Sequence, residues 1–230
     1  MADTMTVPEV ASQPTPFLFR ETLWNTHLIE LDGRGALFNH ILGQWIDEQT
    51  RPGPYSLVEI GVWKGDMIGG VRERFGNLID YIGVDPYGEL KDDPYKGQFW
   101  DTTAEAEAVM ADARAKFDRC GGTLVRTTSD AFFAENNGPF DIVLVDGDHR
   151  YAGAKSDLHN ALDRLRAGGL LILDDVANNF HPEVEWAARH FVKEREADID
   201  ATGIHPLFFR LPEMLFPVVL QFATFRKRRA

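Results

Sequence analysis

The sequence has little cysteine and little positive charge, and each shortage excludes a class of protein. Its single cysteine, Cys120, cannot form an internal disulfide, so nothing indicates an oxidising compartment. Lys and Arg number 24 against 36 Asp and Glu, a net charge of -12. Nucleic acids and anionic membranes need a concentrated basic face, so we expect neither as a partner. The one basic run, 226–229, is predicted to be a solvated tail.

Long hydrophobic runs and targeting signals are also missing. The N-terminus, MADTMTVPEVASQPTP, has acid and proline where a signal peptide needs a basic start and an apolar core. The longest apolar run, 214–225, is too short to span a bilayer and contains Pro217. We therefore expect a cytoplasmic protein with a small-molecule partner. The sequence leaves homo-oligomer formation open.

Apolar runs that alternate with amphipathic stretches are present throughout the chain. Proline, threonine and serine over 1–20 predict a flexible N-terminal segment, and 21–230 is predicted to be a single domain. The apolar runs predict five parallel strands, and helical spacing predicts the covering helices between them. A further antiparallel pair makes this an α/β, Rossmann-like doubly wound seven-stranded mixed sheet. The predicted strands are 55–60, 81–84, 123–127, 140–145, 170–173, 205–210 and 214–225, and the helices include 35–46, a short one capped by Ser129 and Asp130, and 182–194.

Acidic residues end two of the predicted parallel strands. Asp146 follows the strand 140–145, and Asp174 and Asp175 follow the strand 170–173. In a parallel unit both ends lie on the edge of the sheet where ligands bind, about 5 Å apart. Three carboxylates so close repel one another unless a cation joins them. Oxygen ligands favour Mg²⁺, with Mn²⁺ or Ca²⁺ as alternatives, over zinc. Asp148 is explained equally well as a helix cap.

Glycines and an acid mark the first half of the chain as a nucleoside site. Gly61 and Gly65 follow the first strand and allow a sharp turn near a ligand. Trp63 stands where a dinucleotide motif needs its second glycine, so a pyrophosphate is not indicated. Asp85 ends the second strand, about 20 residues on, where a carboxylate can hold ribose hydroxyls.

These residues resemble the S-adenosylmethionine site of class I methyltransferases. The matching pattern is Glu59-x-Gly61-x-x-x-Gly65 after the first strand, Asp85 after the second, and Ser129-Asp130 after the third. The resemblance implies that the two glycines face the methionine part of the cofactor. It also implies that Asp85 binds the ribose and Asp130 the adenine amino group.

The second half resembles a narrower group, the metal-dependent O-methyltransferases that act on sugar hydroxyls of macrolides and related natural products. The matching residues are the run from Asp146 to Tyr151, Asp157-Leu158, Gly168-Gly169, and Asp174-Asp175. Asp146, Asp174 and Asp175 are then the metal ligands. The resemblance makes His149 the base, and its unperturbed pKa of about 6.5 suits proton removal near neutral pH.

The leading hypothesis is an S-adenosylmethionine- and divalent-metal-dependent O-methyltransferase that acts on a hydroxyl of a small molecule, such as a sugar or another natural product. One alternative is a nicotinamide-dependent oxidoreductase, which the missing second glycine disfavours. Another is a catalytically idle nucleoside-binding or scaffold protein of the same fold, which the acid and histidine set disfavours. Tyr87, Tyr95 and Trp100 either line an acceptor pocket or anchor the loop 87–103. His181 is a second candidate for the site.

Overall fold

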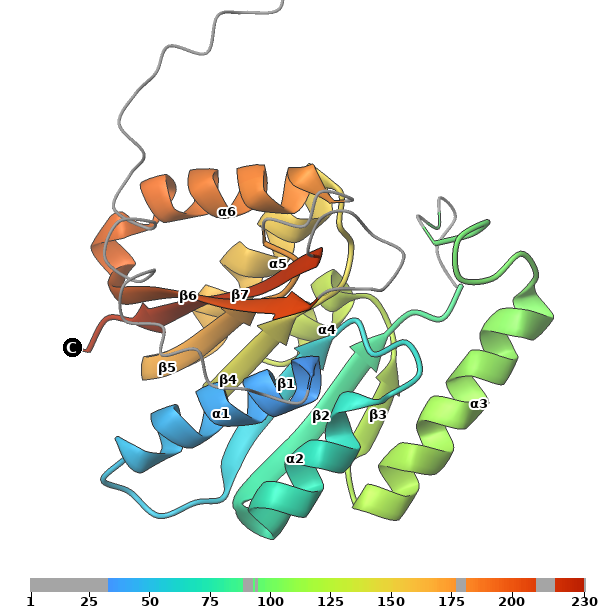
Figure 1. The fold of residues 1–230 in the computed structure, drawn as a ribbon, viewed down its shortest axis with the longest axis horizontal. Coiled ribbons are helices and arrows are strands. Elements are labelled where there is room, and N and C mark those ends of the chain that lie inside the picture. Colours follow the sequence, from blue (N-terminus) through green and yellow to red (C-terminus); the bar gives the residue numbers. More distant parts are fainter. Residues whose placement is uncertain (1–32, 89–92, 94, 177–180, 210–217, 230) are drawn as a thin grey trace, which may run out of the picture.

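A seven-stranded mixed sheet runs through the molecule (Figure 1). The computed structural model describes residues 33–88, 93, 95–176, 181–209 and 218–229. The strand order is β3-β2-β1-β4-β5-β7-β6, with the first five strands parallel and β7 antiparallel to both its neighbours. The predicted fold class is therefore confirmed. The strands are β1 (Tyr55–Ile60), β2 (Ile79–Asp85), β3 (Thr123–Arg126), β4 (Phe140–Val145), β5 (Leu165–Leu173), β6 (Ile199–Phe209) and β7 (Val218–Lys227).

Helices cover both faces of this sheet, as Figure 1 shows. One apolar cluster joins the sheet to α1, α2 and α3, and a second joins it to α4, α5 and α6. β4 has all six residues buried, as a central parallel strand requires. The described helices are α1 (Arg34–Asp47), α2 (Met67–Phe75), α3 (Thr103–Cys120), α4 (Ser129–Glu135), α5 (Tyr151–Arg164) and α6 (Pro182–Glu194), with 3-10 turns at Gly76–Leu78 and Glu196–Asp198. None of the helices in the described part of the chain is long and apolar enough to cross a membrane.

Two local predictions are corrected. β5 begins at Leu165 and continues through Gly168 and Gly169, because its backbone pairs with β4 across a register shift at Phe140/Ile142. The cap of α4 is Thr128, whose side chain accepts a hydrogen bond from the Ala131 amide at 3.2 Å. Ser129 and Asp130 are instead the first helical residues.

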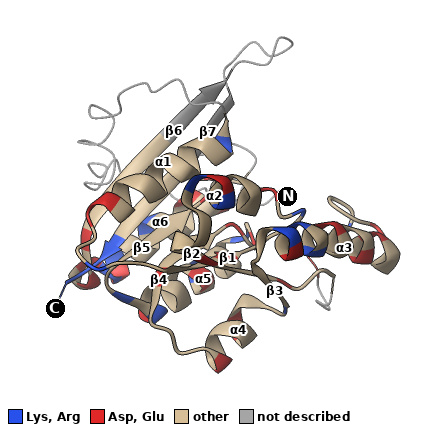
Figure 2. Ribbon diagram, turned by 90° about the horizontal axis from the view of Figure 1, so that it is seen from below, with Lys and Arg blue, Asp and Glu red and all other residues tan. Residues whose placement is uncertain are grey.

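The first half of the basic run at the C-terminus belongs to the sheet, which corrects our expectation of a solvated tail, while Arg228 and Arg229 follow the sheet and are exposed. Arg226 and Lys227 belong to β7, at the end where basic residues gather in Figure 2. Strand pairing fixes their backbone, Arg226 lies 2.9 Å from Glu48, and the Lys227 ammonium donates to the Leu165 carbonyl at 2.7 Å. The predicted flexible segment 1–20 and residues 210 and 214–217 of the predicted strand pair lie outside the described residues. The assignment of 21–230 to one domain stays a prediction.

Candidate functional site

Strand pairing places the carboxyl ends of β1, β4 and β5 side by side at one edge of the sheet. Ile60 of β1 pairs with Val145 of β4, which pairs with Leu173 of β5. The residue after each strand is tied to a neighbouring strand: the Asp146 amide donates to Ile60 at 2.8 Å and the Asp174 amide donates to Val145 at 3.0 Å. The carboxyl ends of these strands therefore form the common edge that the sequence predicts.

Asp146 and Asp174 converge on one positive charge. An oxygen of each carboxylate contacts the same nitrogen, Nη2 of Arg34 at the start of α1. Asp174 is almost fully buried, and its other oxygen accepts a hydrogen bond from the Asp175 amide at 2.7 Å. Burial is the main reason why the pKa of Asp174 is raised well above its usual value, and the negative charge of Asp146 is the second. The positive charge of Arg34 opposes this rise in the pKa. The pair is therefore arranged around a cation.

Arg34 is a site residue that the sequence analysis missed. It lies 112 residues before Asp146 in the chain, at the first position of a helix predicted from its apolar spacing alone. The sequence indicates that the carboxylates need a positive charge, but no local pattern indicates that a distant arginine supplies it.

His149 lies beside the acids, as predicted. Its Nε2 is 3.6 Å from Asp146 Oδ1 and 3.2 Å from Asp175 Oδ2. Burial acts to lower the pKa of His149, but hydrogen bonding and attraction to the two carboxylates outweigh it and raise the pKa to about 9. The ring of His181 stacks on that of His149, with centroids 4.1 Å apart.

The predicted metal ligands do not form one compact set. Among the described residues, one group of three His, Cys, Asp or Glu side chains has donor atoms within 4.8 Å of one another, and it consists of His149, Asp175 and His181. Asp175 has a φ of +57°, a left-handed conformation that aspartate tolerates better than most residues. Its carboxylate contacts His149, Asp174 contacts Arg34, and Asp146 lies near both.

The turn after β1 packs directly on the turn after β4. Gly61 has a φ of +85°, and a Cβ there would overlap the Asp146 carbonyl and lie 2.7 Å from the Cα of Gly147. Gly65 has a φ of +68°, and its amide donates to the Val62 carbonyl at 2.8 Å. Both glycines are therefore needed for the shape of the turn at the sheet edge.

Asp85 holds the same turn from the end of β2. Its carboxylate accepts hydrogen bonds from the amides of Val62 at 2.9 Å, Trp63 at 3.0 Å and Tyr87 at 2.8 Å. Burial raises its pKa, and these three amides act in the opposite direction. The structure thus gives Asp85 a role in ordering the turn after β1. Its contact with a ribose stays a prediction.

The other predicted cofactor residues also have partners within the protein. Glu59 is buried, accepts a hydrogen bond from the Tyr81 hydroxyl at 3.0 Å and has its pKa raised well above the usual value, mainly by burial. The Ser129 hydroxyl lies 2.5 Å from Asp157, and Asp130 accepts hydrogen bonds from Ser156 at 3.1 Å and Asn160 at 2.8 Å. Ser129 and Asp130 therefore join α4 to α5, and the adenine contact stays a prediction.

Asp157 makes stability depend on pH. Burial raises its pKa to about 7, although the Ser129 hydrogen bond acts to lower it. The folded state keeps the proton that the unfolded state releases near pH 4, so the free energy of unfolding falls as pH rises from about 4 to 7. We expect the Asp157→Asn change to remove most of this fall, up to about 4 kcal/mol. Urea unfolding at pH 4.5 and 8 measures it, and the exposed Asp80→Asn is the control. Equal pH slopes for all three proteins would contradict the expectation.

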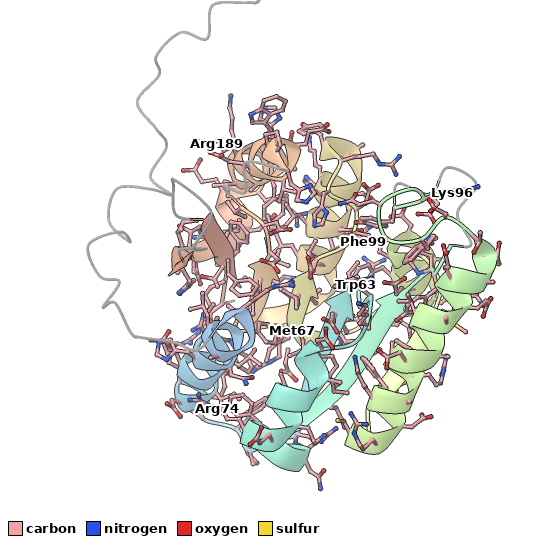
Figure 3. The ribbon with its side chains drawn as sticks, turned by 45° about the vertical axis from the view of Figure 1, so that its right-hand side comes forward. Trp63, Met67, Arg74, Lys96, Phe99 and Arg189 are labelled. Atoms are coloured by element: carbon pink, nitrogen blue, oxygen red, sulfur yellow. The ribbon has the colours of Figure 1, made fainter. Side chains whose placement is uncertain are left out.

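Aromatic residues lie next to His149. The Tyr95 hydroxyl donates to the Gly147 carbonyl, and its ring centroid is 6.1 Å from that of His149. Phe99 lies 5.2 Å from both Tyr95 and Trp63, and Figure 3 shows Trp63 and Phe99 side by side. Both are partly exposed, at 41% for Trp63 and 37% for Phe99. They are available to an acceptor, although the sequence analysis did not single them out for this.

Tyr87 and Trp100 instead anchor the loop after β2. Tyr87 is fully buried and its hydroxyl donates to the Trp63 carbonyl at 3.0 Å, and the Trp100 indole donates to Asp93 at 2.6 Å. A cavity of about 170 Å³ opens beside this loop, with Tyr95, His149 and His181 in its wall.

Comparison with known proteins places this geometry in a family. A family profile described as a methyltransferase domain matches residues 58–176, which include the turns after β1, β2, β4 and β5. No curated protein matches the chain significantly.

Solved structures share the fold at low identity. Cofactor-bound Rv0187 from MTB is 16% identical, has a TM-score of 0.56, and aligns over 89% of this chain and 84% of its own. A candidate O-methyltransferase from Klebsiella pneumoniae is 15% identical with a TM-score of 0.56 over 88% and 83%. An rRNA methylase from Streptococcus thermophilus is 10% identical with a TM-score of 0.53 over 86% and 99%. At these identities the likeness establishes the fold.

Proposed function

The chain belongs to the methyltransferase-domain family, and we propose that within it the protein is a divalent-metal-dependent O-methyltransferase that transfers the methyl group of S-adenosylmethionine to a hydroxyl of a small molecule, such as a sugar or another natural product. The observation that carries this proposal is the convergence of Asp146 and Asp174 on one cationic nitrogen, with His149 beside them. This arrangement lies next to the glycine turn where class I methyltransferases bind their cofactor. The net charge of -12 supports a small acceptor over nucleic acid or membrane.

The Asp146 and Asp174 carboxylates, which converge on one nitrogen of Arg34, fit a hard divalent ion. Oδ2 of Asp174 is buried without a hydrogen bond of ordinary geometry among the described residues, and its contact is the charge of Arg34. Asp146, Asp174 and Asp175 would hold Mg²⁺, with Mn²⁺ or Ca²⁺ as alternatives, by oxygen atoms alone. A divalent ion there supplies Lewis acidity that lowers the pKa of an acceptor hydroxyl.

His149 would take the proton of that hydroxyl at Nε2. The methyl carbon of a sulfonium is already electrophilic, so the protein has to align the acceptor oxygen with it and remove the proton. With a pKa of about 9, set by Asp146 and Asp175 against the effect of burial, His149 is mostly protonated at neutral pH. It can act as a base there only when the negative charge beside it is compensated.

Arg34 would compete with the ion for the same two oxygens. We expect the Arg34→Gln change to strengthen Mg²⁺ binding and to destabilise the chelator-treated protein by about 2 kcal/mol. This is less than the roughly 3 to 5 kcal/mol of a fully buried pair, because Arg34 is partly exposed. Urea unfolding with EDTA and with Mg²⁺ measures both effects, and Arg74→Gln on the exposed side of α2 is the control (Figure 3). A stability loss that Mg²⁺ does not reduce would contradict the competition.

Calorimetry with S-adenosylhomocysteine and with NAD tests the proposal against its alternatives. One S-adenosylhomocysteine per chain and no NAD binding is the expected result. A folded protein that binds only NAD would instead indicate a nicotinamide-dependent oxidoreductase. Binding of S-adenosylhomocysteine without methyl transfer to any of a panel of glycosides and catechols would favour an idle scaffold. Methyl transfer that survives both EDTA and the Asp175→Ala change would remove the role of the metal.

A further inference from the structure

Three side chains, one after β4 and two between β5 and α6, meet beside the aspartate pair. His149 follows β4, Asp175 follows β5, and His181 directly precedes α6. Their donor atoms lie within 4.8 Å of one another, and Asp175 Oδ2 is 3.2 Å from His149 Nε2. The imidazole rings are stacked with an interplanar angle of 25°. Both rings line the cavity of about 170 Å³, which gives a small ligand access to them.

The ring nitrogens of His149 provide a second observation. Both are buried. Nε2 has the carboxylates of Asp175 and Asp146 at 3.2 and 3.6 Å, whereas Nδ1 makes no hydrogen bond within the described residues. Buried polar atoms are nearly always satisfied, so Nδ1 indicates a partner that the protein itself does not supply. Imidazole nitrogen is a ligand for borderline transition-metal ions and a poor one for Mg²⁺, which prefers oxygen.

We propose that His149, Asp175 and His181 bind a borderline divalent transition-metal ion, such as Zn²⁺ or Co²⁺. This site differs in ligand type from the all-oxygen site of Asp146, Asp174 and Asp175, and shares only Asp175 with it. Two imidazoles and one carboxylate leave further coordination positions open toward the cavity, where water can complete them. These three side chains supply all the protein ligands, so ion binding requires neither the cofactor nor the acceptor.

The consequence for catalysis rests on the proposed function. An ion bound to His149 occupies the lone pair that would accept the proton of the acceptor hydroxyl. Micromolar Zn²⁺ is therefore expected to inhibit methyl transfer in the presence of Mg²⁺, and the His181→Ala change is expected to relieve that inhibition. Because His181 is not part of the proposed catalytic set, this variant separates the two sites.

Co²⁺ titration of the full chain, without cofactor or acceptor, tests the site through the visible absorption of the bound ion. We expect one Co²⁺ per chain, and binding weaker by about tenfold or more in His181→Ala and in His149→Gln. The control is His190→Ala, on α6, where the imidazole instead contacts the Tyr151 hydroxyl at 2.6 Å. Circular dichroism establishes that each variant is folded.

The site would be overturned by equal Co²⁺ affinity in wild-type protein and both folded site variants, or by the lack of a Co²⁺ spectrum for the wild-type protein. Loss of Co²⁺ binding in Asp146→Asn with retention in His181→Ala would place the ion on the aspartates and would also overturn it. Failure of the proposed function looks different: S-adenosylhomocysteine would not bind, while the Co²⁺ titration would still depend on His181.

Discussion

Replacing Gly61 by alanine is expected to destabilise the protein by more than about 3 kcal/mol, or to prevent folding. The new Cβ would overlap the Asp146 carbonyl, and the φ of +85° is strained for any residue with a side chain. Rotating a side chain cannot relieve the overlap, because the Cβ would meet the backbone of the neighbouring turn. Relief would require β1 and β4 to separate at the edge where the site is built.

Gly69→Ala provides the matched control for this prediction. Gly69 lies within α2, and a Cβ there would meet no atom within 4 Å. Alanine is a better helix former, so the change is expected to stabilise the protein by up to about 1 kcal/mol. Urea unfolding of both variants measures the difference. A Gly61→Ala protein as stable as the wild type would show that the two turns do not pack as described.

Replacing His149 by glutamine is expected to lower the rate of methyl transfer by about 10²- to 10⁴-fold, the usual contribution of a general base. Affinity for S-adenosylhomocysteine should stay unchanged, because His149 faces the acids and the cavity and makes no contact with the glycine turn among its described interactions. Single-turnover transfer of a labelled methyl group measures the first effect and calorimetry the second.

His190→Gln is the control for the His149 variant, since it removes an imidazole of α6 without touching the acids. Its rate should match that of the wild type. Equal rates for His149→Gln and the wild type would assign proton removal to another group. A parallel loss of cofactor affinity would instead mean that His149 orders the site as a whole.

Elements with strong local patterns were predicted closely from the sequence. The ranges 55–60, 140–145 and 182–194 coincide with β1, β4 and α6, because each is a buried apolar run or an amphipathic stretch bounded by clear turn residues. β5 was predicted too short, since Gly168 and Gly169 are typical of a turn, whereas Leu165 and Leu170 on either side of them pair with β4 and continue the strand. The first two residues of the basic run were mispredicted for a similar reason, since pairing with β5 and β6 places Arg226 and Lys227 in a strand.

The gathering of the acids and His149 at one edge of the sheet was predicted from the sequence, but their contacts with Arg34 and His181 were not. Asp146, His149, Asp174 and Asp175 reach one edge because strand ends of a parallel sheet must do so. Arg34 contacts both Asp146 and Asp174. It lies 112 residues before Asp146 in the chain, and no local periodicity predicts a contact over that separation. The close approach of His181 to His149 and Asp175 is likewise a contact that no local pattern in the sequence predicts.

Electron paramagnetic resonance of Mn²⁺, added to protein saturated with S-adenosylhomocysteine, tests most directly whether the acidic strand ends form a metal site beside the cofactor. We predict that one Mn²⁺ per chain loses its free-ion signal, that Asp174→Asn weakens binding by about tenfold or more, and that His181→Ala leaves it unchanged. A free-ion signal that grows in proportion to Mn²⁺ from the first addition, or binding that survives Asp174→Asn, would contradict the account.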